Sequence, residues 1–198
     1  MNIEQARFNM IEQQIRPWDV LDPGVLELLA IVKREDFVPA VYRALAFVDT
    51  EVPLASSTGG QQCMLAPKVE ARLLQELAVH KHERVLEIDA ELARFAAANL
   101  KRAGVMNATV VQADGAVGWP GEAPFDVIVL SGSVAEVPDA LLAQLKVGGR
   151  LSAIVGFEPV MRAVLITRNG DRGLERRVLF DTVAQRLQGF AEPARFHF

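Results

Sequence analysis

The sequence predicts an α/β protein in which a doubly wound sheet follows an N-terminal helical extension and ends in an antiparallel hairpin. From residue 68 onward, helix-like and strand-like segments alternate, and this alternation is typical of a doubly wound sheet with helices on its faces. Residues 127–130 form a continuously apolar run, as expected of a strand buried on both faces of a parallel sheet. A length of 198 residues with 51% hydrophobic residues suits one compact domain.

The N-terminal part, residues 3–47, reads as a series of helices. Pro17 is expected to end the first of them. Asp22 followed by Pro23 is typical of a helix N-cap with proline in the first turn. The apolar stripe of that second helix is expected at Val25, Leu28, Leu29 and Val32. We expect residues 1–67 to form the extension and the substrate-loop region, and residues 68–198 the α/β domain, as one structural unit overall.

The elements of the α/β region follow from periodicity and from turn residues. They are expected, in order, as a helix over 69–79, a strand over 84–88, a helix over 90–103 ending at Gly104, strands over 108–113 and 125–130, a helix over 138–145 and a strand over 150–155. Residues 163–167 and 177–180, separated by a turn at 169–173, predict the terminal hairpin.

Composition limits the function classes. No apolar run approaches the roughly 20 residues that span a bilayer, and the polar N-terminus has no signal-peptide pattern. The single cysteine, Cys63, fits a reducing compartment, so a cytoplasmic protein is expected. The net charge of -4 argues against nucleic acid, and Arg172, Arg176 and Arg177 read as part of a solvated turn. The three histidines have no partners at metal-ligand spacing, so no metal site is predicted.

Candidate binding residues follow the strands of the predicted sheet, because ligands of doubly wound sheets bind at the carboxyl ends of the strands. Asp114 and Gly115 come directly after one strand, and an acid there can accept hydrogen bonds from a ribose hydroxyl or an exocyclic amine. A plain Asp-Gly turn is the structural alternative. Glu87 stands in an apolar strand, where a buried carboxylate needs partners. A third candidate position is residues 131–133.

Six segments, in the correct order, together resemble the protein-L-isoaspartate O-methyltransferases, a family of class I S-adenosylmethionine-dependent methyltransferases. The resemblance runs from residue 8 to residue 155 and leaves out most of the tail. The segments are residues 10–15 (MIEQQI), 34–39 (REDFVP), 84–88 (RVLEI), 114–120 (DGAVGWP), 123–128 (APFDVI) and 137–151, which includes QLKVGGRL.

The resemblance implies a Rossmann-like methyltransferase sheet, S-adenosyl-L-methionine as cofactor and methylation of the carboxylates of isoaspartyl residues in protein repair. It also implies a protein or peptide substrate, with Glu87, Asp114 and Gly115 at the cofactor. Neither nucleic acid nor membrane is expected as a partner, and the protein is expected to be a monomer or a homodimer. No catalytic residue can be assigned.

One departure from the family pattern lies after the strand at 84–88. There the family continues with a glycine-rich loop, a helix and a second strand that ends in an acid, but here Ile88 runs directly into Asp89. Glu87 therefore reads either as the glutamate of the first strand or as the ribose-binding acid of the second. The unit is either absent from the polypeptide or omitted from the sequence. Omission is favoured, because loss of a central strand would disrupt a parallel sheet.

A second departure lies in the substrate loop, which is Gln61, Gln62, Cys63, Met64 and Leu65. Leu65 stands where the family has its catalytic serine, so no serine is carried over. Cys63 reads as a packing residue. Two alternatives therefore stay open besides isoaspartyl methylation: a methyltransferase with a different acceptor, and a non-catalytic domain that uses the fold for protein contacts.

Overall fold

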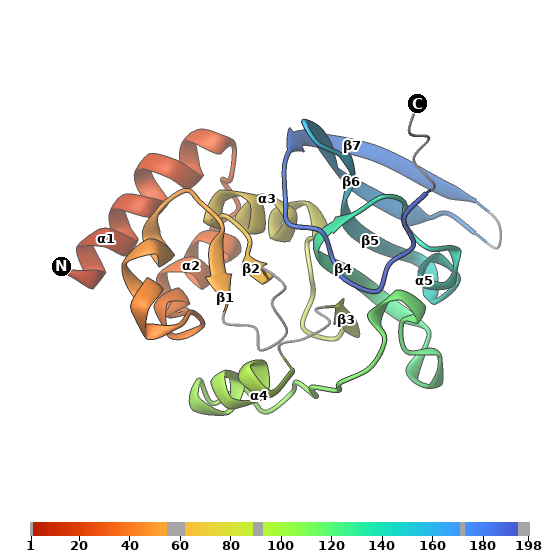
Figure 1. Cartoon of the computed structure of the whole chain (residues 1–198), viewed down its shortest axis with the longest axis horizontal. Helices are drawn as coiled ribbons and strands as arrows, with labels where there is room; N and C mark the ends of the chain where they lie inside the picture. Colours follow the sequence, from red (N-terminus) through yellow and green to blue (C-terminus); the bar gives the residue numbers. More distant parts are fainter. Residues whose placement is uncertain (1, 55–61, 89–92, 171–172, 194–198) are drawn as a thin grey trace. The chain divides into compact units, whose positions relative to one another are not determined.

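The computed structural model describes residues 2–54, 62–88, 93–170 and 173–193. Two compact units are present (Figure 1). The helical unit comprises residues 1–79 and 91–111, and the sheet unit comprises residues 80–90 and 112–198. The expected division into residues 1–67 and 68–198 stays a prediction. No helix in the described ranges has the length and apolar character needed to cross a membrane.

The helical unit begins with α1 (Ile3–Met10), which continues through a π-helical turn (Ile11–Ile15) and a 3-10 turn (Arg16–Trp18). Its remaining elements are α2 (Pro23–Ile31), 3-10 turns at Arg34–Asp36 and Ala40–Phe47, the antiparallel pair β1 (Val52–Leu54) and β2 (Gln62–Met64), α3 (Pro67–Leu77) and α4 (Ala93–Arg102). The core of the unit is an apolar cluster that includes Met10, Ile15, Val20, Phe47 and Val52.

Local sequence signals set the ends of these helices. The Asp22 side chain accepts a hydrogen bond from the Val25 backbone N–H at 2.9 Å, which confirms the predicted cap. Gly104 has φ +72° and lies two residues after Arg102, the last residue of α4, which confirms the predicted C-terminal glycine, since the left-handed conformation favours a residue without Cβ.

The predicted stripe of α2 is partly wrong. Leu26 is the buried residue of this helix, whereas Leu28 and Val32 are 46% and 41% exposed. The helix is apolar nearly all round, with Glu27 as its only charged residue. Periodicity therefore could not distinguish its core-facing side.

The sheet unit is built on five strands in chain order. They are β3 (Val85–Ile88), β4 (Phe125–Val134), β5 (Leu145–Phe157), β6 (Val160–Arg168) and β7 (Leu174–Thr182). β3 and β4 pair in parallel, as do β4 and β5, whereas β6 and β7 add antiparallel. The short helix α5 (Asp139–Ala143) and 3-10 turns at Gly115–Val117 and Pro120–Glu122 connect the strands. The core includes Ile128, Leu130, Leu141, Leu151 and Val164.

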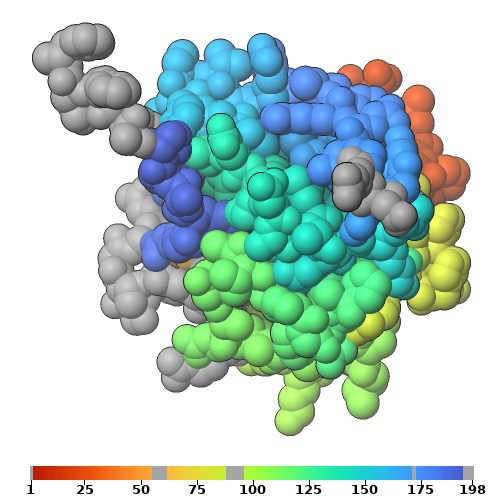
Figure 2. All heavy atoms as spheres, turned by 90° about the vertical axis from the view of Figure 1, so that its right-hand side faces the viewer, coloured from red at the N-terminus to blue at the C-terminus, as the bar shows by residue number. Residues whose placement is uncertain are grey.

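β6 and β7 confirm the predicted terminal hairpin. β7 has its residues 174–178 on the surface, drawn in blue on the face seen in Figure 2. Arg176 and Arg177 are exposed, as predicted, but they lie in strand β7 and not in the predicted turn. Arg172 lies outside the described residues.

The predicted strand at residues 108–113 is wrong, because these residues form no strand in the structure. In the doubly wound order 3-2-1-4-5, the third strand pairs only with the second. The residues that the structure describes include no second strand, so residues 108–113 have no neighbour with which to form a ladder.

The same absence changes the position of β3. Within the described part of the chain, β3 pairs with β4 alone and is therefore an edge strand. Val85 is 44% exposed and Glu87 is also exposed, although the apolar sequence of this strand indicates burial. The full sequence runs directly from Ile88 to Asp89. The favoured explanation, that the unit was left out of the sequence, stays a prediction.

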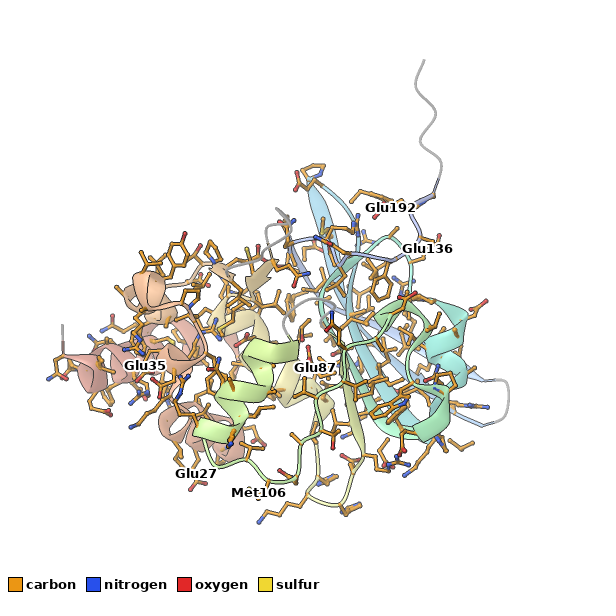
Figure 3. The ribbon with its side chains drawn as sticks, turned by 60° about the horizontal axis from the view of Figure 1, so that its bottom comes forward. Glu27, Glu35, Glu87, Met106, Glu136 and Glu192 are labelled. Atoms are coloured by element: carbon orange, nitrogen blue, oxygen red, sulfur yellow. The ribbon has the colours of Figure 1, made fainter. Side chains whose placement is uncertain are left out.

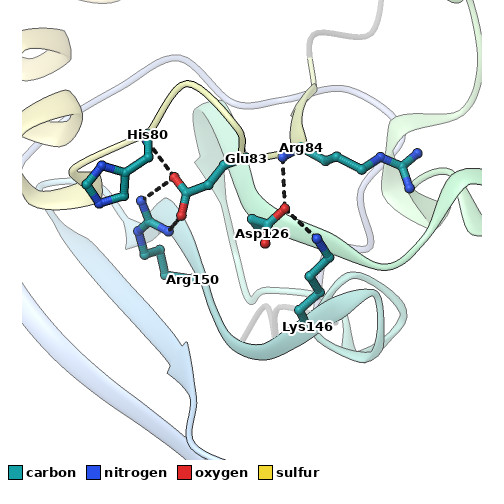
Figure 4. Close-up of polar contacts among 6 residues, drawn as sticks. All are labelled: His80, Glu83, Arg84, Asp126, Lys146 and Arg150. Carbon is teal, nitrogen blue, oxygen red and sulfur yellow. Dashed lines mark hydrogen bonds and ion pairs between the residues drawn. The ribbon is translucent and has the colours of Figure 1, made fainter.

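Ion pairs hold the amino-terminal side of the parallel strands (Figure 4). The guanidinium of Arg150, on β5, donates to both carboxylate oxygens of Glu83 at 2.6 and 2.9 Å, and the His80 backbone N–H donates to Glu83 at 2.7 Å. The hydrogen bonds from Arg150 lower the pKa of Glu83 from 4.5 to about 2, against the opposing effect of burial.

A second carboxylate makes a similar connection. Asp126, on β4, accepts from the Arg84 backbone N–H at 2.9 Å and from Lys146 Nζ, on β5, at 2.6 Å. Both donors lower the pKa of Asp126, and the Arg84 backbone N–H has the larger effect. The two carboxylates thus tie the segment before β3 to β4 and β5.

We expect Glu83→Gln to lower the free energy of unfolding at pH 7 by about 2 kcal/mol, because it removes a charge-assisted bidentate pair. The folded-state pKa of Glu83 lies below its ordinary value, so the pair stabilises above pH 4.5 and its contribution is lost as the pH falls to about 2. Urea unfolding at several pH values measures this loss. Glu122→Gln is the control, because the Glu122–Arg84 pair is about half exposed. Equal losses in both variants would contradict the assignment.

We also expect backbone amides of residues 108–113 to exchange with solvent far faster than those of β4, since they have no ladder hydrogen bonds. Hydrogen–deuterium exchange resolved to single residues measures this, with Val111 compared with Val127 and Ile128. Protection of Val111 equal to that of Ile128 would mean that a strand forms there.

Candidate functional site

Glu87 lies next to the carboxyl end of β3, opposite Val129 of β4 in the strand register. Figure 3 labels it at this end of the strand. The expectation of a buried carboxylate is wrong, because β3 is an edge strand and Glu87 is exposed. An exposed acid at this end of a parallel strand has the position that a ribose-binding carboxylate occupies in doubly wound sheets. Its role as a cofactor ligand stays a prediction.

Asp114 forms the start of the 3-10 turn Gly115–Val117. Its side chain accepts a hydrogen bond from the Ala116 backbone N–H at 3.0 Å, and its carboxylate is exposed. The structure therefore contains the Asp-Gly turn that the sequence offered as the alternative. One carboxylate oxygen suffices for this cap, so the turn does not exclude a ligand at the other oxygen.

A C-terminal segment covers the end of β4, where residues 131–133 were a candidate position. The Ser133 backbone N–H donates to the Gln185 carbonyl at 2.8 Å, and the Leu187 N–H donates to the Ser133 carbonyl at 2.9 Å. A Cβ on Gly132 would meet Leu187 side-chain atoms at 2.7 Å, so glycine is needed for this close approach. Sequence reasoning missed the contact, because residues 183–193 have no periodic pattern.

The predicted substrate loop belongs to the helical unit. Gln61 lies outside the described residues, and Gln62, Cys63 and Met64 form β2, which pairs with β1. Burial raises the pKa of the Cys63 thiol, and Glu51 raises it further. A thiol that is harder to ionise is a poor nucleophile, which agrees with a packing role for Cys63.

Leu65, at the position of the family serine, is buried with 6% of its surface exposed. Its carbonyl accepts a hydrogen bond from a guanidinium nitrogen of Arg34. The side chain at this position is therefore part of the packed interior, and it supplies no hydroxyl.

Arg34 is the positioning residue that sequence reasoning missed. It is 8% exposed, and besides the Leu65 carbonyl it binds the Ala46 carbonyl at 3.0 Å and the carboxylate of Glu70 on α3. A buried guanidinium that reaches three segments fixes the chain just before α3, because five donors in a rigid fork allow several bonds at once. The sequence offered one sign of this role, because Arg34 is a charged residue in the segment 34–39, which resembles the family.

The predicted residues thus fall into two groups. Glu87, Asp114 and Gly115 belong to the sheet unit, whereas Gln62, Cys63, Met64 and Leu65 belong to the helical unit. In the described part of the chain, no group of three or more His, Cys, Asp or Glu side chains is arranged to hold a metal ion.

The parallel pairing of β3, β4 and β5, with the exposed Glu87 near the carboxyl end of β3, defines the class of the protein as a Rossmann-like α/β fold. A family model described as protein-L-isoaspartate (D-aspartate) O-methyltransferase matches residues 5–90 and 87–184. The chain belongs to this family, whose members are S-adenosylmethionine-dependent methyltransferases. The predicted family, fold class and enzyme class are confirmed.

Two bacterial relatives are similar over most of the chain. The protein-L-isoaspartate O-methyltransferase of Rhodopseudomonas palustris is 35% identical over 196 residues, which cover 87% of this chain and 88% of the relative. That of Geobacter metallireducens is 33% identical over 199 residues, covering 89% of this chain and 90% of the relative.

Two solved structures share the fold. One, a protein-L-isoaspartate O-methyltransferase, has a TM-score of 0.77 at 21% identity over 94% of this chain, and the chain spans just 66% of that structure. The other comes from Plasmodium falciparum and is described as a protein-L-isoaspartate O-methyltransferase in complex with S-adenosyl-L-homocysteine. It has a TM-score of 0.76 at 17% identity over 96% of this chain and 99% of that structure.

The family match locates the missing unit. It divides into two segments that meet at residues 87–90. The alignment to the Rhodopseudomonas relative extends over 196 residues but takes in only 87% of this 198-residue chain. The relative therefore has residues without a counterpart here, and the divided family match indicates that the gap follows β3.

The residues present fit an adenosyl cofactor only in part. Exposed acids at Glu87 and Asp114 suit ribose hydroxyls and an exocyclic amine. A glycine turn that lets the backbone approach the cofactor is not available, because the sequence has no glycine between Gly60 and Gly104.

We expect Arg34→Met to lower the free energy of unfolding by roughly 3 kcal/mol, because it leaves Glu70 and two carbonyls without their donor. Thermal and urea unfolding measure the loss. Arg43→Met, at an exposed position of the neighbouring 3-10 turn, is expected to change stability by less than about 0.5 kcal/mol. Similar losses in both variants would exclude a positioning role for Arg34.

Proposed function

We propose that this chain is an S-adenosylmethionine-dependent O-methyltransferase that methylates the carboxylates of isoaspartyl residues in proteins. The observation that carries the proposal is the family match over residues 5–90 and 87–184, which includes the segments around Glu87 and Asp114. Its relatives from Rhodopseudomonas and Geobacter are named for this activity.

The chemistry requires little from acid–base side chains. A carboxylate acceptor with an ordinary pKa near 4 is already ionised at neutral pH. The cofactor, when bound, supplies an activated methyl group. The protein has to orient the two reactants and exclude water. The loss of a serine hydroxyl at Leu65 therefore affects recognition of the acceptor more than the transfer itself.

Glu87 is the proposed partner of the ribose hydroxyls, and Asp114 is the proposed partner of the adenine amine. Gly115 leaves the turn after Asp114 open to a ligand. Since the close-approach turn is absent, these acids would carry a larger share of the binding energy than in a complete family site. The substrate is proposed to be a protein or peptide, bound in the cytoplasm.

A second candidate is a family member that keeps the fold for protein contacts without methyl transfer. The open edge of β3 and the absence of glycine between Gly60 and Gly104 favour it. A methyltransferase with a different acceptor is the intermediate case, and the buried Leu65 favours that one.

Titration calorimetry with S-adenosylmethionine, followed by labelled methyl transfer to an isoaspartyl peptide, tests the proposal on the full chain. We expect heat and transfer, and we expect Glu87→Gln and Asp114→Asn each to weaken cofactor binding tenfold or more, at about 1.4 kcal/mol per tenfold change. Asparagine can still cap the turn at Ala116, so Asp114→Asn isolates the charge. Glu136→Gln, at an exposed position of the sheet unit, is the control.

Each outcome identifies one candidate. Heat with isoaspartyl methylation supports the proposed function. Heat without methylation of that peptide points to another acceptor. A chain that releases no heat and transfers no methyl group is the non-catalytic family member, and the enzymatic proposal then fails.

A further inference from the structure

The turn between β6 and β7 begins with an asparagine that a glycine follows, Asn169–Gly170. The other asparagines of the sequence precede larger residues, and they are Asn2, Asn9, Asn99 and Asn107. Glycine has no Cβ, so the backbone nitrogen of Gly170 is less shielded than the nitrogen after any other asparagine. Asn169 is also exposed, and water therefore reaches its side-chain amide.

The surroundings of Gly170 favour a reaction at its backbone nitrogen. Gly170 has φ +121°, and a Cβ placed on it would meet no atom within 4 Å. Its carbonyl accepts a hydrogen bond from Arg168 Nε at 3.2 Å, and another nitrogen of this guanidinium donates to the Leu145 carbonyl at 2.7 Å. These bonds keep a positive charge beside Gly170. A nearby positive charge stabilises an anion, so it favours loss of the Gly170 backbone proton.

Glu175, on β7, holds the Asn169 side chain in place. Asn169 Nδ2 donates to Glu175 Oε2 at 2.8 Å, and the Asn169 backbone N–H donates to the Gly173 carbonyl at 2.8 Å. If the side-chain amide turns toward the Gly170 nitrogen, the bond to Glu175 breaks. A hydrogen bond between exposed groups contributes little free energy, so Glu175 slows this rotation without preventing it.

We propose that Asn169 is a site of spontaneous deamidation through a succinimide. The Gly170 nitrogen loses its proton to hydroxide and forms a bond with Asn169 Cγ. The bond from Cγ to Nδ2 breaks, and Nδ2 takes up a proton from water and leaves as ammonia. One water molecule then opens the ring and gives aspartate or isoaspartate. The inference goes beyond the proposed function, because it concerns a modification of the chain itself and involves no cofactor.

The modification changes the end of the β6–β7 ladder. A carboxylate has no N–H donor, so the bond from residue 169 to Glu175 is lost and two negative charges face each other. In isoaspartate the main chain also runs through the former side chain, which lengthens the turn closed by the Asn169–Gly173 bond. We therefore expect the neighbouring pair Arg168 and Leu174 to loosen.

Peptide mass spectrometry of the full chain tests the proposal without an activity assay. The chain is incubated in heavy-oxygen water without S-adenosylmethionine and is then digested in ordinary water. We expect residue 169 to take up heavy oxygen about tenfold faster than Asn107, an exposed asparagine that alanine follows. The rate is expected to rise at alkaline pH, because the Gly170 nitrogen has to lose its proton. Electron-transfer fragmentation distinguishes aspartate from isoaspartate, and we expect both.

Two variants of β7 form a matched pair. Glu175→Ala removes the acceptor of the Asn169 amide and is expected to raise the rate about fivefold. Asp181→Ala removes the same charge from an exposed position of the same strand, where the carboxylate pairs with Arg162, and it is expected to leave the rate unchanged. Asn169→Gln is expected to abolish the fast uptake, because its longer side chain would have to close a larger ring. Urea unfolding checks that the three variants fold.

Three results would overturn the proposal. The first is uptake at Asn169 no faster than at Asn107. The second is the same rate in Glu175→Ala as in the unchanged chain. The third is aspartate as the sole product, which would mean direct hydrolysis of the side-chain amide. Hydrogen exchange of the Leu174 amide before and after modification measures the loosening, and an unchanged rate would contradict the expected effect on the ladder.

Discussion

The sheet unit depends on one constraint, which is that a strand exists only where a neighbour satisfies its backbone hydrogen bonds. β4 provides such a neighbour for β3, and β5 provides one for β4. On its other side, β3 has no neighbouring strand among the described residues. This single absence makes β3 an edge, exposes Glu87 and leaves residues 108–113 without a ladder. The ion pairs of Glu83 and Asp126 then anchor the amino-terminal side of the remaining parallel strands.

In the helical unit, the buried arginines Arg7 and Arg34 connect segments that are distant in the sequence, whereas strand pairing does so in the sheet unit. Arg34 and Arg7 are both more than nine-tenths buried, and each is held by carboxylates and, for Arg34, by carbonyls as well. Losing one partner of such a pair costs far more than the pair contributes, since it leaves an uncompensated buried charge. Arg34 therefore fixes the segment around Leu65, and Arg7 connects α1 to the turn that contains Glu35.

The two departures from the family differ in their consequences for function. Methyl transfer to an ionised carboxylate needs orientation more than proton transfer, so the buried Leu65 in place of serine alters the acceptor side without removing the chemistry. The absent glycine turn concerns the cofactor itself, because glycine there lets the backbone approach the cofactor closely. Membership of the family and completeness of the cofactor site are thus separate questions, and the calorimetric titration answers the second.

The sequence alone determined what short-range patterns encode. The Asp22 cap, the glycine after α4, the strand at 127–130 and the terminal hairpin could be read from neighbouring residues, and the family could be read from the order of short segments. Only the tertiary structure decided what depends on distant partners. Residues 108–113 have a strand-like sequence but no neighbour, Glu87 is exposed because of a missing strand, and Arg34 finds partners 12 and 36 residues away. Side-chain pattern reports local preference, whereas pairing, burial and charge compensation depend on which segments meet in space.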